Sequence, residues 1–281
     1  MTVEHISDTA RWVAVYRAME TERPDAHFRD PYARRLAGPK GEAIVRSIRG
    51  GRSMSWAMVV RTVAFDEMML RAVSRGADLV LNLAAGLDTR PYRLDLPRAL
   101  RWVEVDLPGI TDYKEEQLRG EVPRCALERV RLDLTDLAAR RALFTRLGGE
   151  ARQVAVLTEG LLAYLQPEQV ASLAADLHTP PTFARWMTEL ASPWILKRMK
   201  RKYKKITGNA GTAPMHFGPA QGSAFFQPYG WKVAEERSGL EEARRLRREM
   251  PLAWLMRLTW ITAKQRETAR RITQFIELVR T

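Results

Sequence analysis

A short, unbroken apolar run limits the folds open to this chain more than any other stretch does. Residues Asp78–Ala85 read DLVLNLAA and are followed by Gly86. Such a run is typical of a strand that is covered on both faces. Strands separated by stretches long enough for helices favour an α/β fold, with a mostly parallel sheet and a ligand site outside the carboxyl ends of the strands. Six more apolar runs are predicted strands: Trp102–Val105, Val130–Leu132, Val154–Leu157, Phe183–Met187, Trp231–Glu235 and Gln274–Val279.

Apolar residues at helical spacing predict helices before, between and after these strands. The first two of the three helices that precede the first strand form an N-terminal helical segment. The stretch Thr207–Trp231 is rich in Gly, Pro and aromatic residues. Its apolar residues follow neither the spacing of a helix nor that of a strand, so we expect a long loop there. The predicted helices are Thr9–Met19, Asp30–Ile48, Met58–Arg71, the stretch that begins at Pro167, Leu240–Arg248, Leu252–Ile261 and Lys264–Arg271.

The chain of 281 residues contains no Ser/Gly-rich or Pro-rich linker, so we expect a single domain. The only cysteine, Cys125, cannot form an internal disulfide, which fits a reducing compartment. No run of about eighteen apolar residues occurs, so we expect no membrane span and a soluble, cytoplasmic protein. The expected parts are a helical cap at 1–57, a core at 58–190 and 227–281, and a basic and aromatic lid insertion at 191–226.

The net charge of +13 is concentrated in one place. The run KRMKRKYKK at Lys197–Lys205 carries seven positive charges and leaves +6 for the rest of the chain. Such a run is typical of a solvated helix face, and it also suits a rim that attracts an acidic substrate or a nucleic acid. Nucleic acid is the less favoured partner, because only Tyr203 is interleaved with the basic residues.

Small and acidic residues follow the first two predicted strands. Ala84, Ala85 and Gly86 form a turn that lets a ligand approach the backbone, although the three glycines of a dinucleotide fingerprint are absent. Glu104 and Asp106 lie on one face of the second strand, where an acidic residue can accept hydrogen bonds from both ribose hydroxyls. The competing interpretation is a tight structural turn beside an acidic strand end that binds a helix N-terminus or an arginine.

Carboxylates also follow the third and fourth predicted strands. Asp133 can accept a hydrogen bond from an adenine amino group while Leu134 supplies an apolar wall, but Asp133 also suits the N-cap of a helix. Glu159 precedes the apolar stretch GLLAYL, so its burial would require a partner such as a ligand ammonium or a neighbouring arginine. Since parallel strands end at the same edge of a sheet, these side chains are expected around one crevice.

S-adenosylmethionine is the nucleotide ligand that suits this set of side chains. It contains no phosphate, and the chain shows no phosphate-binding loop. Its ribose and ammonium suit carboxylates, whereas its own carboxylate requires a cation, for which Arg61 is the candidate. The alternative for Arg61 is an ion pair with Asp66 or Glu67 on its own helix. We predict no metal site.

Five segments, taken in order, resemble the leucine carboxyl methyltransferase family, including its bacterial and natural-product members. They are RTVAFDEMML, LNLAAGLDTRPYRL, WVEVDLPGITDYK, RLDLTD and LTEGLLAYLQPEQV, and the resemblance spans about Asp8 to Leu177. The resemblance implies a class I S-adenosylmethionine-dependent O-methyltransferase. This fold is Rossmann-like, with a mostly parallel seven-stranded sheet, helices on both faces, a helical N-terminal cap and a substrate-loop insertion.

The resemblance also implies roles for individual residues. Ala84 is a departure, because it stands where the family often has the first glycine of its glycine loop. The family's basic contact from the N-terminal segment matches either Arg11 or Arg17. The remaining matches are Arg61 to the cofactor carboxylate, Ala84, Ala85 and Gly86 to the glycine loop, Asp106 to the ribose, Asp133 and Leu134 to the adenine, Glu159 to the methionine end, and Tyr164 to the methyl-transfer site.

The nature of the methyl acceptor decides whether the site needs a base. A carboxylate is ionised at neutral pH and needs none, whereas a phenol or alcohol benefits from a base poised near pH 7. His216 is the only histidine in the long aromatic stretch and is the candidate base, although a structural role is favoured. Aromatic and Met residues of that stretch either line an apolar pocket or anchor a loop on the core. They are Met215, Phe217, Phe225, Phe226 and Tyr229.

The favoured function is therefore methyl ester formation on a small, acidic, partly aromatic metabolite such as a polyketide carboxylate. Methylation of a hydroxyl or phenol in secondary metabolism is the main alternative. Less favoured are a nucleic-acid methyltransferase that uses the Lys197–Lys205 run and a non-catalytic partner protein that keeps the cofactor site. The protein is expected to be a monomer or a homodimer.

Overall fold

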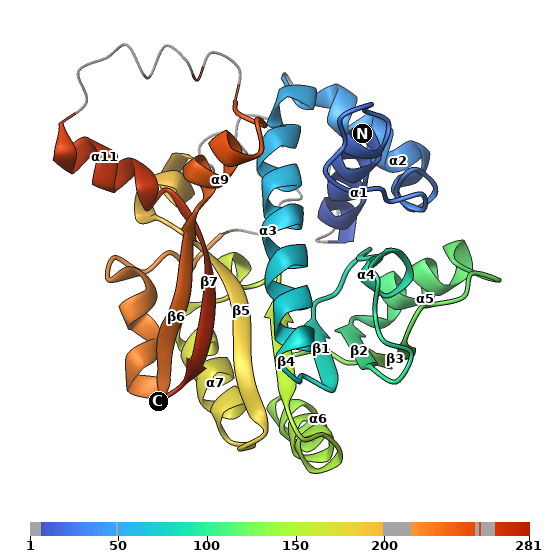
Figure 1. Cartoon of the computed structure of the whole chain (residues 1–281), viewed down its shortest axis with the longest axis vertical. Helices are drawn as coiled ribbons and strands as arrows, with labels where there is room; N and C mark the ends of the chain where they lie inside the picture. The colour runs from blue at the N-terminus through green and yellow to red at the C-terminus, as the bar shows by residue number, and fades with distance from the viewer. Residues whose placement is uncertain (1–6, 49, 199–214, 251–252, 254–261) are drawn as a thin grey trace.

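The computed structural model of the chain describes residues 7–48, 50–198, 215–250, 253 and 262–281. These residues contain a seven-stranded sheet with the order β3-β2-β1-β4-β5-β7-β6. The first five strands are parallel, and β7 runs antiparallel to both β5 and β6 (Figure 1). The predicted mostly parallel sheet is confirmed. Its strands are β1 Leu79–Leu83, β2 Arg101–Asp106, β3 Ala126–Arg131, β4 Val154–Thr158, β5 Phe183–Ala191, β6 Trp231–Ser238 and β7 Thr273–Arg280.

The two central strands, β1 and β4, are buried along their whole length, which explains their continuous apolar sequences. The chain proceeds from β1 outward to β2 and β3, and from β4 outward to β5. This change of direction between β1 and β4 is the switch point at which ligands bind in open α/β sheets. The edge strand β3 begins at Ala126, whereas it was predicted to begin at Val130. The strand is half-buried, and its charged residues Glu128 and Arg129 hid its first residues from the apolar pattern.

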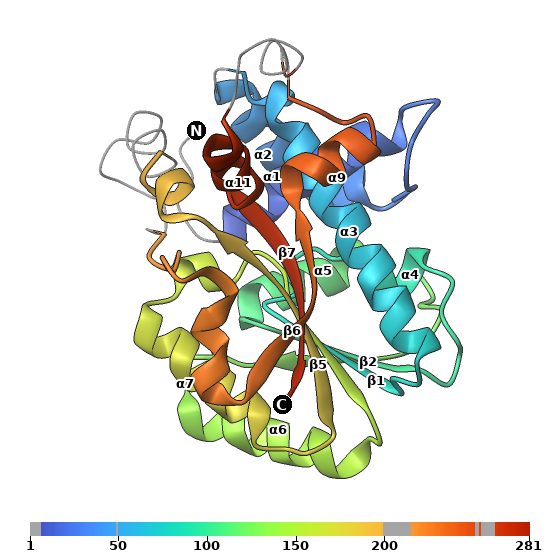
Figure 2. The same cartoon turned by 60° about the vertical axis from the view of Figure 1, so that its left-hand side comes forward.

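Helices cover both faces of the sheet, and each face has its own apolar core. The long helix α3 (Ser55–Ser74) packs on one face, against Val80, Trp102 and Leu157. Helices α6 (Leu137–Glu150) and α7 (Pro167–His178) pack on the other face. Figure 2 shows the sheet between α3 and these two helices. None of the helices among the described residues is both long enough and apolar enough to span a membrane.

Several helices begin at recognisable signals. Helix α6, which was not among the predicted helices, begins after Asp136, whose side chain accepts a hydrogen bond from the Ala139 amide at 3.0 Å. Helix α5, which was also not predicted, has Pro108 in its first turn. The remaining helices and 3-10 turns are α1 Ser7–Thr21, α2 Ala33–Ser47, η1 Arg52–Met54, α4 Arg90–Arg93, α5 Pro108–Gln117, η2 Leu162–Tyr164, η3 Gly222–Tyr229, α9 Gly239–Arg245 and α11 Ala263–Arg270.

The predicted N-terminal helical segment consists of α1 and α2, which pack on each other and form a third apolar cluster. The buried Arg17 of α1 donates to Asp30 at 2.8 Å and to the carbonyl oxygen of Leu87 at 2.5 Å. Leu87 follows the turn after β1, so these bonds fix the helical segment at the carboxyl ends of the strands. Figure 1 shows α1 and α2 grouped at that end of the sheet.

The prediction of a long loop at Thr207–Trp231 is wrong for the part of it that the structure describes. Residues Gly222–Tyr229 form a 3-10 helix, and Phe217 and Phe226 are buried in the core on the α7 side of the sheet. These aromatic residues therefore anchor the chain on the core. The rest of the predicted loop, at 207–214, and most of the basic run, at 199–205, lie outside the described residues, as does the predicted helix Leu252–Ile261 except for Ala253.

Candidate cofactor site

The turn after β1 brings the backbone close to β2. Ala84 and Gly86 both have a left-handed backbone, with φ of +54° and +50°. Asp106, at the end of β2, accepts hydrogen bonds from the Gly86 amide at 2.6 Å and from the Leu107 amide at 2.8 Å. Burial raises the pKa of Asp106, against the opposing effect of these two amides. The predicted glycine-loop residues and the predicted ribose acid are thus neighbours at the sheet edge.

Glu104 lies two residues earlier on the same strand and has a different environment. Its side chain is 3 % exposed and accepts hydrogen bonds from Lys114 at 2.8 Å and from Arg129 at 3.0 Å. Both carboxylate oxygens are therefore engaged by side chains of the protein. This arrangement is that of a buried ion pair within the framework, and the role of Glu104 in binding ribose stays a prediction.

Arg61 of α3 lies between the carboxyl ends of β4 and β5. Its Nε is 2.9 Å from Oε1 of Glu159, and its Nη1 donates to Oε1 of Glu189 at 3.1 Å. The amide of Gly160 donates to the same oxygen of Glu189 at 2.9 Å. The sequence offered Asp66 or Glu67 as alternative partners of Arg61, and among the described residues neither pairs with it.

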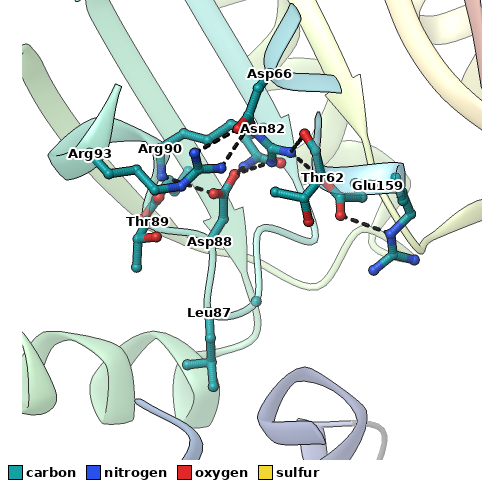
Figure 3. Close-up of polar contacts among 12 residues, drawn as sticks. Thr62, Asp66, Asn82, Leu87, Asp88, Thr89, Arg90, Arg93 and Glu159 are labelled. Carbon is teal, nitrogen blue, oxygen red and sulfur yellow. Dashed lines mark hydrogen bonds and ion pairs between the residues drawn. The ribbon is translucent and has the colours of Figure 1, made fainter. Parts of the chain in front are cut away.

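A second arginine connects this pair to the turn after β1. Figure 3 shows Arg90 reaching Asp66, Asp88 and Glu159. Its distances to their carboxylate oxygens are 2.6, 2.8 and 2.8 Å, respectively. Arg93 also reaches Asp66, at 2.6 Å. We call the seven residues of this network the charge cluster: Arg61, Arg90, Arg93, Asp66, Asp88, Glu159 and Glu189.

The pKa values of Glu159 and Glu189, the two glutamates that pair with Arg61, are shifted in opposite directions. Burial raises the pKa of Glu159, but Arg90 and Arg61 outweigh burial, so the pKa is held below its ordinary value. Burial also raises the pKa of Glu189, where Arg61 opposes the shift and the charge of Glu159 adds to it, so the pKa is above its ordinary value. Carboxylates whose pKa values are pushed apart in one site commonly have different tasks.

The two predicted catalytic residues lie on adjacent segments. Tyr164, at the end of η2, hydrogen-bonds the side chain of Thr9 from α1, and burial raises its pKa. The charges of Arg61 and Glu189 also act on Tyr164, which places this side chain beside the charge cluster. The amide of His216 donates to the carbonyl oxygen of Ala163 at 2.7 Å. The backbone at His216 is thereby held next to Tyr164.

The predicted adenine-side residues follow β3. Asp133 is exposed, and its Oδ1 accepts hydrogen bonds from the amide and hydroxyl of Thr135, at 2.9 and 2.7 Å. The helix cap that competed with ligand binding is formed by Asp136 instead. Leu134 is partly buried against the core. Asp133 is thus available at the same sheet edge as the other candidate residues.

The sequence analysis missed Glu189 and Arg90. A signal for Glu189 was present, because Thr188-Glu189 repeats the Thr158-Glu159 pair, and Thr158 and Thr188 lie opposite each other in β4 and β5. Arg90 lies in a segment that already carried the resemblance, LNLAAGLDTRPYRL, but only the small residues before it were assigned roles.

The chemistry of this edge fits S-adenosylmethionine. The charge cluster contains four carboxylates and three arginines, so its net charge is −1 when all its members are ionised. A ligand with one net positive charge would neutralise it. At Gly86 a Cβ would lie 3.4 Å from the Cβ of Ala10, so a side chain would fill the space over the turn. Within the described residues, no group of three or more His, Cys, Asp or Glu could hold a metal ion.

Comparison with known proteins finds relatives of this chain. A protein of Parafrankia, provisionally named an S-adenosyl-L-methionine-dependent methyltransferase, is 31% identical over 272 residues, which cover 92% of this chain and 87% of the relative. A protein of Saccharopolyspora erythraea with the same provisional name is 38% identical over 184 residues, which cover 63% of this chain and 64% of the relative, just under two thirds of its length.

Solved structures share the fold at low sequence identity. A DUF574 family protein from Streptomyces avermitilis has a TM-score of 0.60 at 15% identity, with 97% of each chain covered. A protein from Thermobifida fusca, described as a methyltransferase on a provisional basis, has a TM-score of 0.58 at 14% identity, covering 99% of this chain and 95% of its own. The leucine carboxyl methyltransferase family matches residues 10–178. This chain therefore belongs to the leucine carboxyl methyltransferase family, and it is an S-adenosylmethionine-dependent methyltransferase.

Proposed function

We propose that the protein is an O-methyltransferase that converts the carboxylate of a small, acidic, partly aromatic metabolite into its methyl ester. The observation that carries this proposal is Arg61, a buried guanidinium held between the ends of β4 and β5 with Tyr164 beside it. Its guanidinium is paired with Glu159 and Glu189, and it is also a hydrogen-bond donor that suits a carboxylate of the cofactor or of the acceptor. Lys197 and Arg198, which follow β5, begin the basic run that we expect to attract an acidic acceptor.

Different residues of the chain would bind different parts of the cofactor. Arg61 would hold the cofactor carboxylate, Glu159 its ammonium and Asp106 the ribose hydroxyls. The bound cofactor supplies a methyl group that its sulfonium has already activated. The protein then has to align the acceptor and exclude water, and Tyr164 is suited to both because it is buried next to the charge cluster. Asp133 and Leu134 would contact the adenine.

Hydroxyl methylation is the second candidate, and the position of His216 favours it. Its backbone amide donates to the carbonyl oxygen of Ala163, directly before Tyr164, so His216 lies in a segment beside the proposed methyl-transfer site. A base at that position would serve an acceptor that loses a proton on methylation. A carboxylate acceptor would leave His216 without a chemical task.

The test is transfer of a labelled methyl group to a matched pair of acceptors, 1-naphthoate and 1-naphthol. We expect the label in the methyl ester of 1-naphthoate, from which mild base releases it by hydrolysis. We expect little label in the methyl ether of 1-naphthol. Methylation of 1-naphthol alone would reject the ester. Cofactor binding with no transfer to either compound or to a wider acceptor set would favour the non-catalytic partner, and steeply salt-dependent binding of RNA or DNA would favour the nucleic-acid function.

A further inference from the structure

Glu189 has no part in the proposed cofactor contacts, yet it is built into the site. Its side chain is 17% exposed and lies at the carboxyl end of β5, where Arg61 and the Gly160 amide donate to it. The order of the strands places it next in line after the proposed cofactor residues. Asp106 is the last residue of β2, Gly86 follows β1, Glu159 follows β4, and Glu189 lies on β5. A ligand that extends from ribose to methionine along this edge would meet Glu189 beyond its methionine end.

The hydrogen bonds of Glu189 are unevenly distributed over its two oxygens. Both donors, Arg61 Nη1 and the Gly160 amide, end on Oε1. Within the part of the chain that the structure describes, no donor reaches Oε2. This pattern matches a carboxylic acid, in which the carbonyl oxygen accepts hydrogen bonds and the other oxygen carries the proton.

The charge balance of the site points in the same direction. With Glu189 ionised, the charge cluster has one surplus negative charge, which the single positive charge of the cofactor neutralises. A carboxylate acceptor would then bring an uncompensated negative charge into a largely buried site, which is costly. With Glu189 protonated, the cluster, the cofactor and the acceptor carboxylate together are neutral.

We propose that Glu189 is a specificity-determining residue that binds the acceptor carboxylate in its protonated form, donating a hydrogen bond from Oε2. The proposal rests on the proposed ester-forming function. The raised pKa of Glu189 supports it, because burial and the charge of Glu159 both favour the acid form. Among the described residues, the titratable groups whose charges couple to Glu189 are Arg61 from α3, Glu159 from the end of β4 and Tyr164 from η2. From β7 its paired neighbour is Phe275, which carries no charge.

The first arm of the test examines the proton directly, without an acceptor. Infrared spectra of the wild type and of Glu189→Gln are compared at about pH 6, where an ordinary glutamate of pKa about 4.3 is ionised. We expect a protonated-carboxyl stretch that Glu189→Gln removes. The control is Glu277→Gln on the neighbouring strand β7, which removes a buried carboxylate paired with Arg185 of β5 and should leave that stretch unchanged. A difference spectrum with carboxylate bands only would overturn the proposal.

The second arm measures KM and kcat for 1-naphthoate against pH. In the wild type KM should rise about tenfold per pH unit above the pKa of Glu189, with kcat little changed, because only the acid form donates. The amide of Glu189→Gln also donates, so that variant should bind 1-naphthoate with a pH-independent KM. Glu189→Ala should raise KM about ten- to hundredfold, the loss of one hydrogen bond to a charged group.

The two arms separate failure of this proposal from failure of the proposed function. If Glu189→Gln abolishes transfer and the wild type methylates 1-naphthol, Glu189 acts as an ionised base and the proposal is wrong. If the infrared stretch is present but 1-naphthoate is never methylated, the ester function fails, and with it the acceptor role of Glu189, while the protonation of Glu189 stands.

Discussion

At the scale of single residues, Ala84 shows a conflict between residue type and conformation. Its φ of +54° lies in the left-handed region, which costs a residue with a Cβ roughly 1–2 kcal/mol and glycine nothing. The turn keeps this conformation because it brings the Gly86 amide to Asp106 at 2.6 Å. Strain of this kind is tolerated where the surrounding structure fixes the backbone, and it is common at ligand sites.

Ala84→Gly is therefore expected to stabilise the protein. Relief of the left-handed strain should exceed the extra chain entropy of glycine, which costs about 0.5–1 kcal/mol. We expect the free energy of unfolding to rise by up to about 1 kcal/mol in urea denaturation. Ala85→Gly is the matched control, because Ala85 has no positive φ and should lose stability. A loss of stability in Ala84→Gly equal to that of the control would contradict the left-handed turn.

Asp106 and Glu104, two residues apart, are expected to respond differently to loss of charge. Asp106→Asn should weaken S-adenosylmethionine binding about ten- to hundredfold, because hydrogen bonds from ribose to a charged group are lost. Glu104→Gln should lower the free energy of unfolding, since it leaves Lys114 and Arg129 without their buried counter-charge. Calorimetric titration and urea denaturation of both variants measure the two effects. Equal weakening of cofactor binding would instead support a ribose contact by Glu104.

At the scale of elements, buried strands were the easiest to predict. A strand covered on both faces, such as β1, is a continuous apolar run, and few other structures produce one. The edge strand β3 was predicted four residues short, since Glu128 and Arg129 interrupt its apolar pattern. For helix α6 only a helix start near Asp133 was noted, because the buried side of this helix is formed partly by Arg140, which pairs with Asp176.

The site was predicted unevenly for a similar reason. Residues that follow a strand, such as Asp106 and Glu159, stand out as charges after an apolar run. Glu189 lies inside β5, which extends to Ala191, whereas the strand was predicted to end at Met187, so Glu189 was not recognised as a carboxylate near a strand end. The ion pairs of Arg90 depend on distant segments meeting in space, which local patterns do not report.

The two aspartates before α6 allow a test at the scale of one element. Asp136→Ala removes the N-cap and should cost about 1 kcal/mol of stability, with S-adenosylmethionine affinity unchanged. Asp133→Ala should leave stability within about 0.5 kcal/mol, because Asp133 is exposed, and should weaken cofactor binding. Urea denaturation and calorimetry distinguish the two. Unchanged cofactor affinity in Asp133→Ala would remove this residue from the site.

At the scale of the whole molecule, the charge cluster links folding stability to pH in two opposite ways. The folded-state pKa of Glu159 is lowered, so its contribution is complete above the unfolded pKa of about 4.3 and is lost as pH falls through the folded value. The folded-state pKa of Glu189 is raised, so its contribution is present at low pH and is lost as pH rises from about 4.3 through its folded value.

We expect the variants Glu159→Gln and Glu189→Gln to change different parts of the plot of unfolding free energy against pH. Relative to the wild type, Glu159→Gln should reduce the loss of stability on the acid side, and Glu189→Gln should reduce the loss on the side towards neutral pH. Each limb has a slope of at most about 1.4 kcal/mol per pH unit for one proton. Urea denaturation over a series of pH values gives both slopes. Flattening of the same limb by both variants would show that the two carboxyls titrate in the same direction.

The placement of β7 between β5 and β6 affects how the protein is made. Residues Thr273–Arg280 leave the ribosome after the six other strands of the described sheet, yet they fill an internal position in it. Until then β5 presents an open edge and β6 has no partner strand, so both are exposed to pairing with other chains. A ribosome that stalls shortly before residue 273 would therefore release a product with a nearly complete cofactor edge and an unclosed sheet, which proteases and chaperones would recognise as unfinished.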